Sequence, residues 1–255
     1  MFQKYIRDEQ NFSLAIQKIQ FPSFDPELAL LAMKKDLLIY FKKVVSYNLH
    51  IWDFSSEDVM HSKTELALVL QQERDFSKTY LKKEYQEMKV VQEELLDFLA
   101  QLHQIEVPKT EDADQISSLY QVIIDIGDSS KYLKDVWDRV EDWQWSSSID
   151  LQKDYESLRM MVLEFYTSVL QLLANLDNKQ AFELVQELLE KIEIHDTRYL
   201  KMFKHKEGSD VDLANLIQVS RYFSMSCMAL VKAIENVRLS IEDKKYLGEH
   251  IKELF

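Results

Sequence analysis

Apolar residues recur every three or four positions along most of this sequence, which is the spacing of one face of an α-helix. Only three glycines and three prolines occur in 255 residues, so the tight turns that a β-sheet protein needs are scarce. The sequence therefore predicts an all-α protein of long antiparallel amphipathic helices that pack nearly parallel in a bundle. The clearest heptad stretch carries Leu81, Tyr85, Met88, Val91, Leu95, Phe98 and Leu102.

Polar or helix-breaking segments divide these helices. Asp25 followed by Pro26 is a typical helix start, with Asp25 as the N-cap. A helix is expected from about 76 to 103, a later one runs on through Val140, and a short terminal helix is expected at 241–254. We expect an N-terminal linker at 1–24, a first helical unit with an additional N-terminal helix at 25–145, and a second helical unit at 146–255.

The net charge and the number of cysteines exclude some classes of function. The formal net charge is −13, which opposes binding to nucleic acid because phosphate backbones require a basic surface. Cys227 is the only cysteine, so no intramolecular disulfide forms and a reducing, cytoplasmic compartment fits best. Cys227 itself falls on an apolar helical stripe, where a buried thiol is expected. The most apolar stretch, 162–176, is too short to span a bilayer.

The sequence also contains an internal repeat. The string Leu81-Lys-Lys-Glu-Tyr85 resembles Leu151-Gln-Lys-Asp-Tyr155, and the register continues to about residues 102 and 172. A second pairing matches 119–140 with 216–237 and aligns Ser129 with Ser226. The different offsets of the pairings place the helix at about 179–204 as an insertion in the second copy.

No motif for nucleophilic or zinc-dependent catalysis is present, and we expect a protein that is not an enzyme. The best candidate for a binding site is Asp125-Ile-Gly-Asp128, which places carboxylates three residues apart on one helix face. Gly127 permits a close approach by a metal, a partner backbone or another helix. Alternatively, both carboxylates are exposed, with Asp128 paired to Lys131. Trp137 is expected in the core, and Trp143 and Trp145 at the bundle end.

The segment Ile123-Ile-Asp-Ile-Gly-Asp-Ser-Ser130 resembles the Leu-Glu-Arg-Ile-Gly-Asp-His helix of the PhoU family. The string Phe24-Asp-Pro-Glu-Leu-Ala-Leu-Leu-Ala32 looks like the link after the membrane domain in bacterial sodium/phosphate cotransporters. The resemblance implies tandem three-helix units from about Phe24 to Leu239. Ile124 stands where the family has Glu, and Ser224 and Met225 replace the Gly-Asp pair in the second copy.

PhoU proteins use such acids, with others on a neighbouring helix, to hold metal clusters. By resemblance, Asp125 and Asp128 are candidate ligands of a single weakly bound divalent metal, and Glu84 and Asp154 are candidates by their matched places in the repeat.

The function implied by the resemblance is a regulatory or accessory domain of a sodium-dependent phosphate transporter. Such a domain lies at the cytoplasmic face of the inner membrane and contacts the transporter membrane domain in its own chain or a partner protein. A homo-oligomer is also possible. Two alternatives stay open: a free-standing PhoU-like phosphate-response regulator, and an unrelated helical-bundle scaffold.

Overall fold

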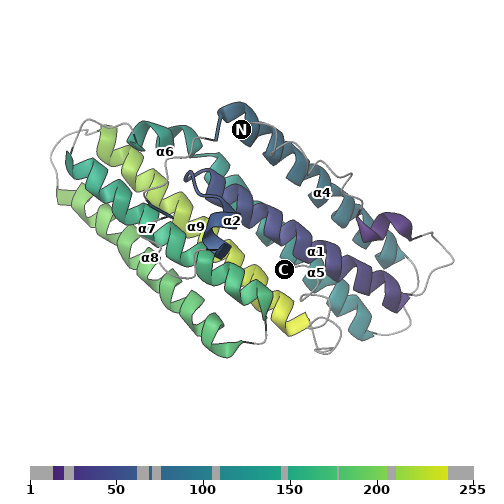
Figure 1. The fold of residues 1–255 in the computed structure, drawn as a ribbon. Helices are drawn as coiled ribbons and strands as arrows, with labels where there is room; N and C mark the ends of the chain where they lie inside the picture. The colour runs from purple at the N-terminus through teal and green to yellow at the C-terminus, as the bar shows by residue number, and fades with distance from the viewer. Residues whose placement is uncertain are drawn as a thin grey trace.

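The computed structural model describes residues 14–19, 26–61, 69–70, 76–104, 110–144, 149–176, 178–205 and 211–240. Within these ranges every regular element is helical (Figure 1), so the predicted all-α class is confirmed. The elements are η1 (Ala15–Lys18), α1 (Pro26–His50), α2 (Ser56–His61), α4 (Lys78–Gln104), α5 (Thr110–Lys134), α6 (Trp137–Gln144), α7 (Ile149–Ala174), α8 (Lys179–His205) and α9 (Val211–Ser240).

Helices α5 and α9 form the most extensive helix contact of the bundle. They run antiparallel, because Ser129 contacts Ser226 while Asp125, earlier on α5, reaches Lys232, later on α9. Their closest point is a hydrogen bond of 2.8 Å between the hydroxyls of Ser129 and Ser226. Small side chains let the two backbones approach there. Both helices carry further small buried residues, Gly127 and Ser130 on α5 and Ser220, Ser224 and Cys227 on α9.

Helices α1, α4 and α8 pack on this pair, and α7 packs on α1 and α8. Helix α4 contacts α1 and α5, and helix α8 contacts α7 and α9. Helix α1 also packs against α5 and α7, so it joins the two groups. In Figure 1, α4 and α8 lie on opposite sides of the bundle. Within the predicted linker, η1 packs on α1, where the backbone NH of Ile16 donates to Asp36 Oδ2 at 2.8 Å.

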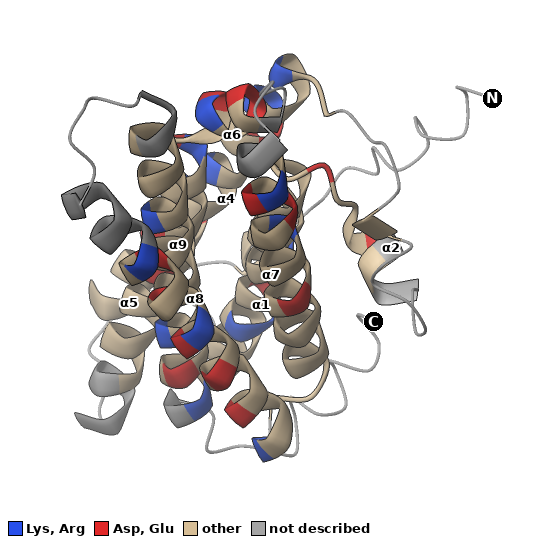
Figure 2. Ribbon diagram, turned by 90° about the vertical axis from the view of Figure 1, so that its left-hand side faces the viewer, with Lys and Arg blue, Asp and Glu red and all other residues tan. Residues whose placement is uncertain are grey.

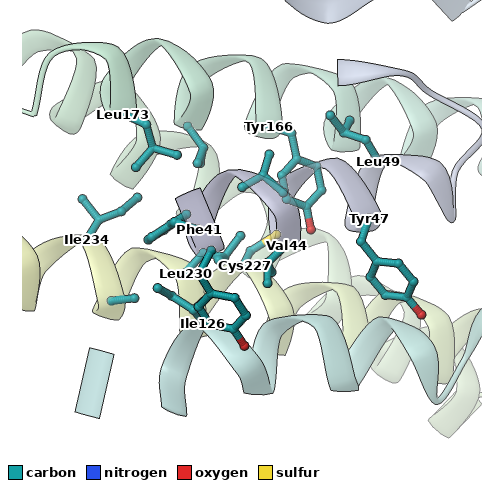
Figure 3. Packing of buried hydrophobic residues seen from close by; sticks show 14 of the residues in the cluster. Phe41, Val44, Tyr47, Leu49, Ile126, Tyr166, Leu173, Cys227, Leu230 and Ile234 are labelled. Atoms are coloured by element: carbon teal, nitrogen blue, oxygen red, sulfur yellow. The ribbon is translucent and has the colours of Figure 1, made fainter. Parts of the chain in front are cut away.

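Buried polar groups meet where α1, α5, α7 and α9 come together. Asn48 donates from Nδ2 to the Ser129 hydroxyl at 2.9 Å, and the Tyr166 hydroxyl lies 3.4 Å from that of Ser226. All four side chains are buried. The same four helices also supply much of the apolar core, and Figure 3 shows Phe41, Val44, Ile126, Tyr166, Leu173, Cys227, Leu230 and Ile234 packed together. Because hydrogen bonds are directional, this network favours one register of the helices.

The side-chain hydrogen bonds of this centre follow an approximate two-fold relation, although the backbone of α1 packs closely on α5 whereas α7 packs mainly on α1 and α8. Ser129 on α5 corresponds to Ser226 on α9, and Asn48 on α1 corresponds to Tyr166 on α7, so α1 matches α7. Helix α4 is then the counterpart of α8, because α4 packs on α1 and α5, and α8 packs on α7 and α9. The predicted match of residues 119–140 with 216–237 also pairs Ser129 with Ser226. The predicted match of residues 81–102 with 151–172 aligns α4 with α7 instead of α8. Amphipathic helices share heptad spacing whatever their place in a bundle.

The helix boundaries differ in detail from those that the sequence predicts. The helix expected to continue through Val140 is interrupted by a turn at 135–136, and α6 starts at Trp137. Trp137 is half-buried against the core and Trp143 is buried. The predicted boundary at 145 falls between α6 and α7. Asp25, Trp145 and the helix expected at 241–254 lie outside the described residues.

We expect substitutions at Ser129 to destabilise the bundle. Ser129→Ala removes the partner of Asn48 and Ser226 and is expected to lower the free energy of unfolding by about 1–2 kcal/mol. Ser129→Leu also forces α5 and α9 apart and should cost more. Urea unfolding measures both effects, with Ser157→Ala at an exposed site of α7 as the control. A Ser129→Leu protein as stable as the native one would contradict the close α5–α9 contact.

Candidate functional site

Asp125 lies in the contact between α5 and α9. Its Oδ1 accepts hydrogen bonds from Gln121 Nε2 at 2.9 Å and from Lys232 Nζ at 3.1 Å. The Asp125 side chain is 7% exposed, whereas that of Lys232 is 58% exposed. The second oxygen, Oδ2, is buried and has no hydrogen-bond partner. The carboxylate of Asp125 therefore forms an ion pair that links the two central helices.

Asp128 lies half-buried on the same helix as Asp125. Its charge acts on Tyr40 of α1 and Tyr85 of α4: burial raises the pKa of both hydroxyls, and the Asp128 carboxylate adds to the rise. Asp128 thus faces the α1–α4 side of α5, whereas Asp125 is bonded to α9. The two carboxylates point toward different neighbouring helices.

Gly127, between these acids, permits close packing of α4 on α5. A Cβ at this position would overlap the side-chain amide of Gln92, with Cδ at 2.8 Å and Oε1 at 2.9 Å. Gln92 is buried, and its Nε2 donates to the carbonyl of Ile123 at 3.4 Å. The sequence left a metal, a partner backbone or another helix as candidates for the group close to Gly127. In the structure, that group is the Gln92 side chain of helix α4.

Glu84 lies on α4 at the C-terminal end of α1. Its Oε2 is 2.8 Å from Nδ1 of His50, and the His50 ring stacks on Phe76 with centroids 4.2 Å apart. Tyr80 contacts the same imidazole edge-on at 5.7 Å. Glu84 therefore serves as the partner of a buried histidine and fastens α4 to α1.

Asp154 lies on α7, half-buried and near His195 of α8. Burial lowers the pKa of His195, and the negative charge of Asp154 partly opposes that shift. The sequence-predicted ligands are thus spread over α4, α5 and α7. Across the described part of the chain, no three His, Cys, Asp or Glu side chains lie together in a way that would hold a metal ion.

The sequence did not reveal a second group of buried polar atoms, where the turn after α1 meets α7. Trp52 Nε1, Tyr155 OH and Arg159 Nε are buried without hydrogen-bond partners. The Trp52 and Tyr155 rings stack at 6.2 Å, and Arg159 donates to the Trp52 carbonyl at 3.4 Å. Each unpaired buried donor costs about 1–3 kcal/mol. No sequence pattern marks these residues, because Trp52 lies in the turn after α1, and Tyr155 and Arg159 alone fit the amphipathic helix α7.

Cys227 lies in the centre of the bundle, as the sequence predicted. It is fully buried between α5 and α9, and burial raises the pKa of its thiol well above the usual value. A thiol in this state is a poor nucleophile because the reactive species is the thiolate. Cys227 is therefore part of the packing between the central helices.

Comparisons with protein-family models, with curated proteins and with solved structures found no match for this chain. Of the helices in the described ranges, none combines the length and the apolar character that crossing a membrane requires.

We expect Lys232→Met to destabilise the protein by about 1–2 kcal/mol, because it leaves the buried Asp125 carboxylate without its cation. Adding Asp125→Asn should restore most of the loss, since the amide carries no charge. Thermal and urea unfolding measure both variants, and Lys131→Met on the exposed face of α5 is the matched control. Equal stability of Lys232→Met and the native protein would show that the ion pair contributes nothing.

Proposed function

We propose that this chain is a PhoU-like regulatory or accessory domain of a sodium-dependent phosphate transporter, which acts by binding between helix surfaces rather than by catalysis. The observation that carries the proposal is the antiparallel α5–α9 pair, with α1 and α4 packed on α5, and with α8, which also packs on α7, packed on α9. Tandem three-helix units are the architecture that the PhoU resemblance implies. The Ile-Gly-Asp part of the PhoU-like segment lies on α5.

Two acidic residues that could have formed a binding site are engaged in contacts between helices, which supports a function through helix surfaces. Asp125 is paired with Lys232, and Glu84 is paired with His50. Both carboxylates contribute to holding helices together. A bundle held together in this way can move as a rigid body. A partner that binds at one surface can therefore shift the position of a second partner bound at another surface. The proposed partner is the membrane domain of the transporter, at the cytoplasmic face of the inner membrane.

Two other functions agree with the same helices. A free-standing PhoU-like regulator would bind a separate transporter or kinase, and an unrelated scaffold would use the bundle for another assembly. A membrane-spanning segment encoded upstream in the same reading frame favours the transporter domain. A separate gene beside phosphate transport genes favours the free-standing regulator.

Deleting this coding segment from its source cells tests the proposal. We expect sodium-dependent uptake of radiolabelled phosphate to lose its dependence on the phosphate level of the medium. Re-expressing the native segment in its own gene context should restore that dependence, and the Ser157→Ala variant, changed only at an exposed site, should restore it equally. Unchanged uptake in the deletion strain at both low and high phosphate would contradict the proposal.

A further inference from the structure

Helices α4 and α8 correspond to each other in register. Both are amphipathic, and each has one polar side chain among its buried residues at the same place: Gln92 on α4 and Asp196 on α8. This match also places buried Leu81 with Val185 and buried Met88 with Ile192.

The ends of the two helices agree with the same match. Lys78 of α4 pairs with Glu141 of α6 at 2.8 Å. At the matching place on α8, Phe182 contacts the guanidinium of Arg238 of α9 at 4.3 Å. Glu141 and Arg238 themselves correspond in the register that matches Ser129 with Ser226. The register between α4 and α8 therefore rests on interior residues and end contacts, independently of their outer faces.

Each of these helices presents an outward stripe with exposed apolar residues at corresponding positions. On α4 the exposed apolar residues are Tyr80 (45% exposed) and Val90 (54%), and on α8 they are Leu184 (41%) and Ile194 (70%). The match of α4 with α8 pairs Tyr80 with Leu184 and Val90 with Ile194. These four residues account for most of the large apolar side chains that are exposed in the described segments.

Charges between and beyond these apolar residues are reversed from one stripe to the other. On α4 the stripe carries Lys83, Glu87 and Glu94, and the corresponding residues of α8 are Glu187, Lys191 and Arg198. All are exposed except Glu94, which is half-buried and accepts a hydrogen bond from Gln17 at 2.9 Å. The spacings of three and four residues place each set along one face of its helix.

We propose that α4 of one copy of this chain packs parallel to, and in register with, α8 of a second copy. In this arrangement Tyr80 and Val90 face Leu184 and Ile194. Lys83, Glu87 and Glu94 face Glu187, Lys191 and Arg198 in turn, so every charged position meets the opposite charge. Apolar contact supplies attraction, and the charges select the partner and its direction.

Other pairings of the same surfaces bring like charges together. Turning α8 antiparallel about the Val90–Ile194 contact places Glu94 opposite Glu190. A parallel pair of α4 helices places Lys83 on Lys83 and Glu87 on Glu87, and an antiparallel pair about Val90 places Glu87 opposite Glu93. Like charges at close range oppose association. The charges therefore favour the parallel α4–α8 contact over these three pairings.

The contact joins different surfaces of the two copies. Helices α4 and α8 lie on opposite sides of the bundle (Figure 1), and charged residues lie along the outer face of α8 (Figure 2), so each copy retains one stripe after pairing. Such a heterologous contact continues into rows or closed rings. Exposed ion pairs are individually weak, and the net charge of −13 makes the copies repel each other. The association is therefore weak and depends on protein concentration.

Charge reversal provides the test. Lys83→Glu/Glu87→Lys reverses α4, and Glu187→Lys/Lys191→Glu reverses α8; both variants keep the net charge of the chain. We expect the native protein to associate in sedimentation velocity as its concentration rises from micromolar to millimolar. Each variant alone should associate at least about tenfold more weakly, because like charges then face each other. An equimolar mixture of the two variants should regain association, because each reversed stripe then meets a reversed partner.

Circular dichroism and melting temperature establish that both variants are folded. The Lys83–Glu87 ion pair of 3.7 Å is kept in reversed order, so little loss of helix stability is expected. Three results would overturn the proposal: a native protein that stays monomeric at millimolar concentration, single variants that associate like the native protein, or a mixture that stays monomeric. The test measures self-association alone, so its outcome is independent of any role in phosphate uptake.

Discussion

The close antiparallel contact of α5 with α9 is the constraint on which the rest of the bundle depends. The hydroxyls of Ser129 and Ser226 meet at 2.8 Å, which requires small side chains where long amphipathic helices usually carry large ones. The large side chains come instead from the flanking helices, among them Phe41 and Tyr166. In the polar network at this contact, Asn48 of α1 bonds Ser129 and Tyr166 of α7 lies beside Ser226. Helices α4 and α8 pack on α5 and α9, respectively.

This arrangement explains why the carboxylates that looked most like a binding site are engaged inside the fold. Where two helices meet closely, a buried charge needs a partner from the facing helix. Lys232 supplies that partner to Asp125, and Arg221 supplies it to Asp196 at 3.0 Å. The outer faces of α4 and α8 have no such constraint, and their charges are arranged in reversed order. The features that support a binding function therefore lie on the outside of the bundle.

The sequence predicted the helices well and their pairing in part. Helix existence followed from apolar periodicity, which depends only on local spacing. The correspondence of α5 with α9 was found because 119–140 and 216–237 share specific residues, including Ser129 and Ser226. The correspondence of α1 with α7 was missed: Asn48 and Tyr166 take equivalent places in the polar centre although their side chains differ.

The contacts of the candidate site residues could not be predicted from the sequence. Asp125 was identified as unusual because of its neighbour Gly127, but its partner Lys232 lies on a helix far along the chain. Glu84 was selected through the match of 81–102 with 151–172, which the contacts do not support, and its partner is His50. Which side chains meet across helices depends on register and rotation. Periodicity alone gives neither.

The central claim is that helices α1, α4 and α5 correspond to α7, α8 and α9. Pulsed electron paramagnetic resonance, which measures distances between spin labels, tests this claim most directly. Labels at the exposed residues Lys35 of α1 and Glu87 of α4 report one group, and labels at Lys153 of α7 and Lys191 of α8 report the other. The buried Cys227 is replaced by Ser in both samples. The two-fold arrangement predicts the same distance distribution for both pairs. Clearly different distributions would contradict it, and with it the register on which the α4–α8 contact rests.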